Sequence, residues 1–120
     1  MVSHGTGGSL LGHADLVVAL ARAGDVVVML EQPGDNFRDR SWVTDTRYFS
    51  ERPAQLLALL RAFLDREGSA GALAGGLLGE LNIDASRVSL IGHSAGGYTA
   101  ALSLQSIRMR HLLLNTVSGT

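Results

Sequence analysis

The sequence predicts an α/β protein, a three-layer sandwich with a mostly parallel sheet. Three observations lead to this class: helical and strand-like segments alternate along the chain, the strand-like runs are short and uninterruptedly apolar, and glycine or other turn residues separate the segments. The apolar fraction of 46% argues against disorder. Because 120 residues suffice for one core, we interpret residues 1–120 as belonging to one domain.

The first two elements lie before residue 31. Apolar residues recur at a helical period across 9–23, and Gly24 follows as a stop signal. The run at 26–30 is apolar and β-branched, which is typical of a parallel strand buried on both faces. Turn residues at 32–36 end this run. We therefore expect a helix followed by a buried strand.

A second helix is expected over residues 51–67. An apolar stripe recurs there at helical spacing, Ser50 stands where an N-cap is needed, and Pro53 falls in the first turn. Residues 68–79 are almost all Gly, Ala and Leu, and we interpret them as a loose connection with one helical turn.

The last third of the chain continues the alternation. Residues 88–91 form an apolar run after a turn, which predicts a second strand. Small residues then open a helix that is expected over 95–106, and 112–114 begin a third predicted strand.

The most specific motif is Gly-His-Ser-Ala-Gly at residues 92–96, between a predicted strand and a predicted helix. A serine on such a turn is held in a strained backbone with its hydroxyl exposed, and the flanking Gly92 and Gly96 let strand and helix approach. The new helix directs its free N–H groups at the place where an oxyanion forms. The competing explanation is a chance pentapeptide in a glycine-rich chain. The neighbouring strand and helix favour a nucleophile elbow at Ser94.

A second motif, His-Gly-Thr-Gly-Gly-Ser, occupies residues 4–9. Consecutive glycines leave backbone N–H groups uncovered, as a loop that donates to an oxyanion requires. On its own, the segment fits a flexible glycine-rich terminus equally well. Together with the elbow, it indicates an oxyanion hole in which the N–H groups of Thr6 and Ala95 are the donors.

These motifs carry a family resemblance. The segments Ser-His-Gly-x-Gly-Gly-Ser, Val-Val-x-x-Glu-Gln-Pro-Gly-Asp-Asn and Gly-His-Ser-Ala-Gly-Gly-Tyr resemble the dienelactone-hydrolase-like branch of the α/β hydrolases. Within that branch, they are similar to the serine group of the platelet-activating-factor acetylhydrolases. The resemblance spans residues 3–117.

The resemblance implies a partial α/β-hydrolase fold and a carboxylic-ester or acyl hydrolase that works through an acyl-enzyme on Ser94. A small-molecule ester is the implied partner, and no cofactor is implied. The family order of Ser, then Asp, then His implies a triad Asp and His beyond residue 120. The resemblance also implies a central strand before His4, of which only Met1 and Val2 are present. We therefore expect an incomplete domain of a longer enzyme, nearly inert by itself.

The four histidines of the sequence are poor candidates for the general base. His111 precedes a predicted strand and is expected at the sheet edge opposite to Ser94. His93 shares the elbow with the serine, and His13 belongs to the first predicted helix. His4 is expected on the correct face, but the resemblance assigns it to the oxyanion loop.

Aromatic side chains gather after the first predicted strand, at the edge of the sheet where Ser94 is expected. Four of the six in the chain fall in this segment: Phe37, Trp42, Tyr48 and Phe49. Either they line a substrate pocket together with His4, or they anchor a long loop to the core. The sequence favours neither interpretation.

Composition excludes several other classes of protein. Ten basic and eleven acidic residues give a net charge of −1 without a basic cluster, which disfavours nucleic-acid binding. The absence of cysteine excludes disulfides and thiolate metal sites, and no other metal-ligand spacing is present. The apolar runs are too short for a membrane span. The first residues do not resemble a signal peptide, so the compartment is open, with the cytoplasm as default. The oligomeric state is open as well.

Two other functions compete with the hydrolase interpretation. A nucleotide-binding module would use residues 92–97 to hold phosphate, but Tyr98 stands where a further glycine is needed and no Gly-Lys-Ser/Thr follows. A non-catalytic hydrolase-fold fragment that serves as a binding or assembly module remains open.

Overall fold

The computed structural model of the chain describes residues 1–64 and 83–118, the side chains of 109–118 excepted. Its centre is a three-stranded parallel sheet in the order β2-β1-β3. The strands are β1 (Val2–Ser3), β2 (Met29–Leu30) and β3 (Ile91–Gly92). The expected position of the segment before His4, at the middle of the sheet, is therefore confirmed.

Both outer strands are shorter than the apolar runs predict. Val2 pairs with Met29 on one side and with Ile91 on the other. In this register, residues 26–27 and 89 have no pairing partner in β1. Val26 and Val88 are correspondingly 42% and 40% exposed. A strand exists only where a neighbour accepts its hydrogen bonds, and an apolar run alone does not fix its ends.

The first predicted helix is confirmed, with a tighter first turn. The 3₁₀ turn η1 (Leu10–His13) leads directly into α1 (Ala14–Arg22). Ser9 caps this turn, because its hydroxyl accepts a hydrogen bond of 3.3 Å from the N–H of Leu11. Gly24 follows with φ of +99°, a left-handed conformation that suits glycine after a helix end.

The second helix begins four residues before its predicted start. Helix α2 (Arg47–Leu64) contains both Ser50 and Pro53 in its interior, so the prediction of Ser50 as N-cap is wrong. The hydroxyl of Ser50 instead donates 3.2 Å back to the carbonyl of Arg47. Asp45 supplies the N-terminal contact, since its Oδ1 accepts a 2.8 Å hydrogen bond from the N–H of Arg47.

The expected end of that helix at residue 67 and the connection at 68–79 lie outside the described residues.

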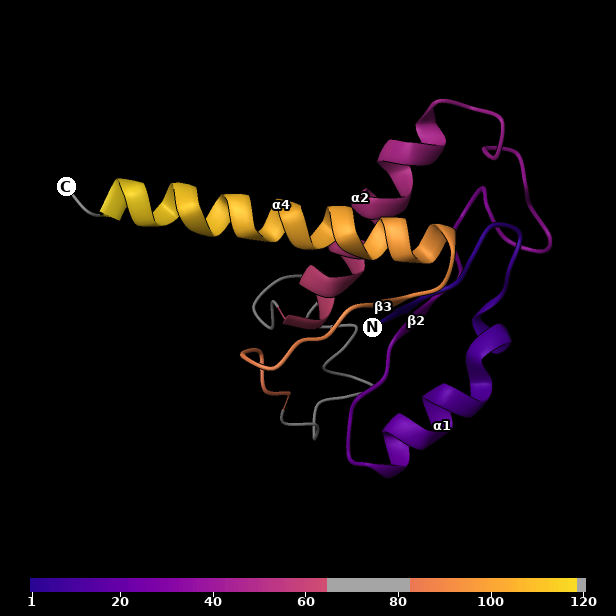
Figure 1. The fold of residues 1–120 in the computed structure, drawn as a ribbon, viewed down its shortest axis with the longest axis horizontal. Helices are drawn as coiled ribbons and strands as arrows, with labels where there is room; N and C mark the ends of the chain where they lie inside the picture. The colour runs from indigo at the N-terminus through magenta and orange to yellow at the C-terminus, as the bar shows by residue number, and fades with distance from the viewer. Residues whose placement is uncertain (65–82, 119–120) are drawn as a thin grey trace.

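The prediction of a third strand at 112–114 is wrong, and so is the predicted helix end at Ser106. Helix α4 (Ala95–Ser118) continues through both positions and extends well beyond the rest of the fold (Figure 1). No glycine or proline interrupts the sequence from residue 98 to residue 118. Leucine is also a strong helix former, and a run of leucines lacks the β-branching that favours a strand.

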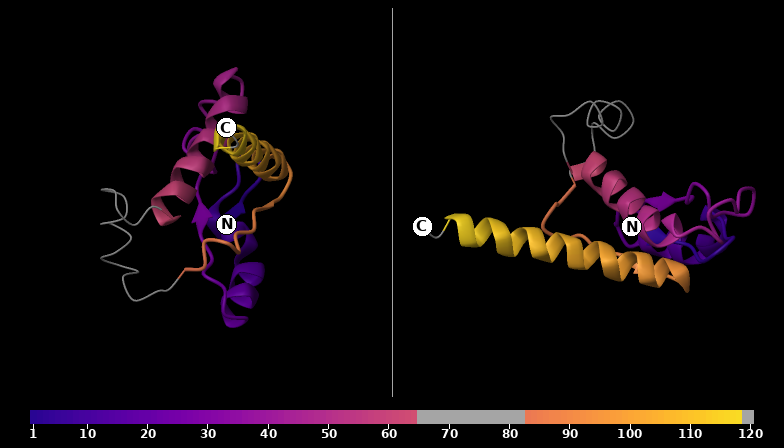
Figure 2. Two further views of the ribbon diagram at one scale, coloured as in Figure 1. Left: turned by 90° about the vertical axis from the view of Figure 1, so that its left-hand side faces the viewer. Right: turned by 90° about the horizontal axis from the view of Figure 1, so that it is seen from above.

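Helices lie on both sides of the strands. Helix α2 packs across α4, and α4 packs on β1 and β3. Helix α1 lies across the strands from these two helices (Figures 1 and 2). The buried apolar residues among those described are few: Val2, Tyr48, Leu56, Leu60 and Ala100. The α/β class is thus confirmed, with a small sheet and a small core.

Within residues 1–64 and 83–118, no helix is both long enough and apolar enough to cross a membrane.

Candidate active site

Ser94 occupies a left-handed turn between the end of β3 and the start of α4. Its φ of +54° is the only positive value at a non-glycine residue in the described part of the chain. This conformation costs an L-residue about 1–2 kcal/mol. The turn closes with hydrogen bonds of 2.9 Å from Gly96 N–H to the His93 carbonyl and from Gly97 N–H to the Ser94 carbonyl. Ser94 itself is exposed, as a serine projecting from a strand-to-helix elbow should be.

Two glycines allow this turn to pack against the sheet. A Cβ on Gly92 would overlap the backbone of Gly96, and a Cβ on Gly96 would overlap the carbonyl of Ser3 in β1. Gly97 is different, because a Cβ there would meet its nearest neighbour, the Gly92 carbonyl, at an ordinary 3.5 Å. The first and last glycines of the motif are therefore required by close backbone approach.

The glycine-rich loop after β1 passes directly beside the serine. A Cβ built on Gly5 would lie 3.2 Å from the Cβ of Ser94. Within the described residues, the backbone N–H groups of Thr6 and Ala95 donate to no other group. For Ala95 this follows from its place in the first turn of α4, where N–H groups have no acceptor in the helix.

His4 is turned into the core and is only 3% exposed. Its Nε2 accepts a 3.1 Å hydrogen bond from the backbone N–H of Gln32, so its Nδ1 carries the proton and donates 2.7 Å to the Gly5 carbonyl. Both ring nitrogens are therefore engaged. The expectation that His4 lines a substrate pocket does not agree with this burial, and the ring instead connects the loop to the end of β2.

His13 and His93 form no hydrogen bond with the serine hydroxyl. His13 and His93 pack edge to face with ring centroids 5.3 Å apart. His111 lies within α4 and not before a strand, which corrects the expectation for this residue. Among the described residues, no side chain forms a hydrogen bond with the hydroxyl of Ser94.

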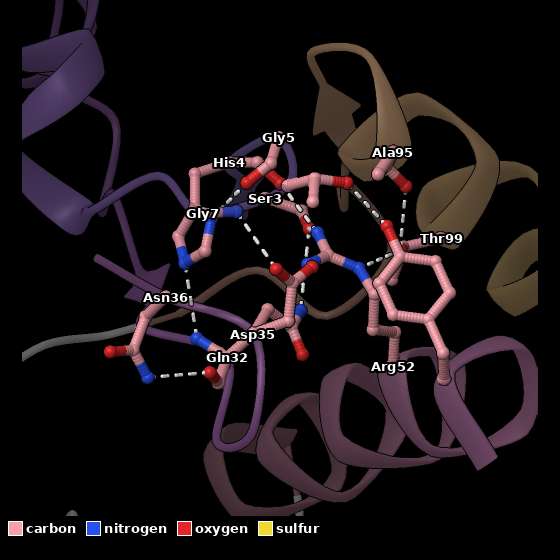
Figure 3. A network of polar contacts seen from close by, with 12 residues as sticks. Ser3, His4, Gly5, Gly7, Gln32, Asp35, Asn36, Arg52, Ala95 and Thr99 are labelled. Atoms are coloured by element: carbon pink, nitrogen blue, oxygen red, sulfur yellow. Dashed lines mark hydrogen bonds and ion pairs between the residues drawn. The ribbon is translucent and has the colours of Figure 1, made fainter. Parts of the chain in front are cut away.

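A buried ion pair lies beneath the loop and the elbow (Figure 3). Arg52 of α2 and Asp35, which follows β2, are each 1% exposed and are joined through Arg52 Nη1 and Asp35 Oδ2. Arg52 also donates from Nη2 to the His4 carbonyl, and from Nε over 2.9 Å to the hydroxyl of Thr99 in α4. The other oxygen of Asp35 accepts a 2.8 Å hydrogen bond from the N–H of Gly7.

The spacing of apolar residues in α2 indicates that Arg52 is buried, although no sequence motif contains Arg52. One face of α2 is buried at every fourth residue: Tyr48, Arg52, Leu56 and Leu60. Extending the leucine stripe by one turn towards the start of the helix therefore places an arginine in the core. A buried guanidinium requires an acidic partner, and Asp35 has that role in addition to being the turn residue that the sequence indicates.

The aromatic residues divide into two groups. Tyr48 is buried, and its hydroxyl lies 2.5 Å from the hydroxyl of Thr6. Its ring packs edge to face on Phe49 at 5.2 Å, and Phe49 packs in the same way on Tyr98 at 5.7 Å. Phe49 and Tyr98 are 58% and 40% exposed, and Tyr98 lies one helical turn beyond Ser94.

Phe37 and Trp42 lie elsewhere. Phe37 is 55% exposed with the Arg38 guanidinium over its ring at 4.8 Å. The Trp42 ring covers Gly34, where a side chain would have no room. Of the four aromatic residues expected either to line a pocket or to anchor the loop, Tyr48 contacts the loop beside Ser94 through its side chain. Phe37 contacts that loop through its backbone N–H, 2.9 Å from the Gly8 carbonyl.

Other features of the described residues lie away from this site. An open depression of about 580 Å³ lies at the amino ends of the outer strands, between residues such as Val26 and Val88. In the parts of the chain that the structure describes, no group of three or more His, Asp or Glu side chains is placed to hold a metal ion.

Comparison of the chain with models of known protein families, with curated proteins and with solved structures found no match.

Proposed function

We propose that Ser94 is the nucleophile of a carboxylic-ester hydrolase with a partial α/β-hydrolase fold, a three-layer sandwich around the parallel sheet. The observation that carries the proposal is the left-handed backbone of Ser94 at the strand-to-helix turn, with the Gly5 loop against it. A strained, exposed serine at this place in a parallel sheet has no evident structural use, whereas nucleophile elbows require it.

The proposed reaction is acyl transfer through Ser94. Its Oγ attacks the ester carbonyl while its proton passes to a general base, and the carbonyl oxygen becomes an oxyanion. The free N–H groups of Thr6 and Ala95 stabilise that oxyanion, assisted by the amino end of α4. The C–O bond to the alcohol then breaks as the base returns the proton to the leaving alcohol, and water hydrolyses the acyl-enzyme to the acid and free Ser94. The described side chains provide no base at Ser94, and the resemblance implies an Asp and a His that follow it in chain order.

The surface beside the serine favours an apolar substrate. Phe49 and Tyr98 are exposed and pack edge to face on each other, and Tyr98 lies one helical turn beyond Ser94. Exposed aromatic rings next to a reactive group bind apolar chains and rings. We therefore propose an ester whose acyl or alcohol group is an alkyl chain or an aromatic ring.

Pre-steady-state hydrolysis of p-nitrophenyl butyrate by the natural polypeptide tests the proposal. An acyl-enzyme mechanism releases a burst of p-nitrophenol close to one equivalent per chain. Ser94→Ala should abolish the burst. Ser41→Ala, which alters an exposed serine in the segment between β2 and α2, should retain it. A folded wild-type protein that releases no p-nitrophenol above the uncatalysed rate would instead favour the non-catalytic binding module.

A further inference from the structure

We propose that Arg52 and Asp35 are positioning residues that hold both oxyanion donors in place from beneath the site. The proposal rests on the function proposed for Ser94. One guanidinium is connected through Asp35 to the N–H of Gly7, the residue after Thr6, and through Thr99 to the carbonyl of Ala95 (Figure 3). The two donors come from segments about 90 residues apart in the sequence, and this pair is a shared support for both.

The first chain of contacts runs through Asp35. One carboxylate oxygen receives Arg52 Nη1, and the other accepts the Gly7 N–H at 2.8 Å. The Gly7 nitrogen belongs to the peptide group that follows Thr6. Its hydrogen bond fixes the plane of that peptide and so the direction of the loop at the first oxyanion donor. Arg52 adds a second restraint, because Nη2 donates to the His4 carbonyl two residues earlier.

The second chain of contacts runs through Thr99. Its hydroxyl accepts from Arg52 Nε at 2.9 Å and donates to the Ala95 carbonyl at 2.8 Å. Ala95 supplies the other proposed oxyanion donor. The hydroxyl therefore connects the guanidinium to the first turn of α4, directly after the nucleophile, and Thr99 has no exposed surface.

Chemistry separates this role from simple core filling. A buried ion pair is expensive to desolvate, and an apolar pair of similar volume often folds at least as well. Apolar side chains, however, cannot fix the direction of a peptide N–H or a carbonyl, whereas charge-assisted hydrogen bonds do. A pair that is 1% exposed at both residues and contacts both donor segments therefore serves geometry more than stability.

The test compares four variants of the natural polypeptide by the rate at which Ser94 reacts with a fluorophosphonate. Arg52→Met combined with Asp35→Leu removes both charges and should fold, as judged by circular dichroism. Its labelling rate should fall roughly 100-fold, the loss typical of a missing oxyanion donor. Thr99→Val leaves the ion pair intact, and its labelling rate should also be lower than that of the wild type. Arg52→Lys should recover part of the rate, and Arg61→Met, an exposed arginine on the same helix, should match wild type.

Amide hydrogen exchange provides a second measurement that does not depend on reactivity. The Gly7 amide should lose protection in the double variant, while the Gly8 amide, which donates 3.0 Å to the Gly5 carbonyl, should keep it. A folded double variant labelled at the wild-type rate would overturn the proposal. If the double variant fails to fold, an unchanged rate in Thr99→Val would overturn it. If the wild type is not labelled, the function proposed for Ser94 fails, and unchanged Gly7 protection in the double variant would overturn the positioning role separately.

Discussion

Gly96, in the first turn of α4, lies so close to the carbonyl oxygen of Ser3 that any side chain at position 96 would overlap that oxygen. The contact joins the central strand to the helix that follows the proposed nucleophile. It therefore sets how near Ser94 lies to the loop that leaves β1, where the proposed oxyanion hole forms.

Replacing Gly96 by alanine should destabilise the protein, because the new methyl group forces α4 away from β1. Overpacking of this kind costs about 1–3 kcal/mol. Gly97→Ala is the matched control: its methyl group has 3.5 Å of room, and alanine favours a helix over glycine by up to about 1 kcal/mol. Urea unfolding measures both. Equal effects of the two substitutions would contradict the close approach.

The backbone of Ser94 predicts an unusual order of stability among its variants. Glycine adopts a φ near +54° without strain, whereas alanine does not. Ser94→Gly should therefore be more stable than Ser94→Ala by about 1 kcal/mol, although glycine normally destabilises a helix start. Thermal unfolding of the two variants under the same conditions measures the difference. A more stable alanine variant would indicate an ordinary backbone at the serine.

The exposed aromatic pair predicts a preference among fluorophosphonate probes. Lengthening the alkyl chain of the probe should accelerate labelling of the wild type, because the chain covers Phe49 and Tyr98. Phe49→Ala should reduce that dependence on chain length, and Phe37→Ala should leave it unchanged, since Phe37 is exposed beneath Arg38. A greater loss of chain-length dependence in the Phe37 variant would contradict binding at Phe49 and Tyr98.

The start of α2 predicts a pH effect. Hydrogen bonds from the side chain and backbone of Arg47 hold the pKa of Asp45 below its ordinary value. A carboxylate with a lowered pKa stabilises the fold above its unfolded pKa, and this contribution is lost as the pH falls through the folded pKa. Asp45→Asn should therefore unfold with a weaker acid dependence than wild type in titrations below about pH 4.

Substitution at Ser50 distinguishes the two candidate caps of α2. Ser50→Ala should change stability little, because Ser50 lies inside the helix. A larger loss in Ser50→Ala than in Asp45→Asn at neutral pH would restore Ser50 as the cap that its sequence position indicates.

Local signals predicted the first helix better than they predicted the strands. The helix that ends before Gly24 was predictable because its period and its stop signal are both local. Strand length depends on a partner, and the apolar runs at 26–30 and 88–91 do not show where β1 begins. The leucines at 112–114 fit a strand or a helix equally well by hydropathy, and the unbroken stretch of helix formers before them decides for α4.

Part of the candidate site was predictable from the sequence, and part of it was not. The motif at 92–96 was visible because its glycines and serine have fixed spacing, and it led to the residue with the strained backbone. Arg52 was missed because a charge on a helix is expected to face water. Its burial follows from a partner in another segment, Asp35, and such pairing over distance leaves no pattern along the chain.

The site of covalent modification decides whether Ser94 is the nucleophile. The natural polypeptide is treated with a fluorophosphonate, digested, and analysed by mass spectrometry. If Ser94 is the nucleophile, one adduct per chain forms, on Ser94, and none forms after prior denaturation in urea. Modification that persists in Ser94→Ala, or a folded wild type that remains unmodified, would contradict the assignment of Ser94 as the nucleophile.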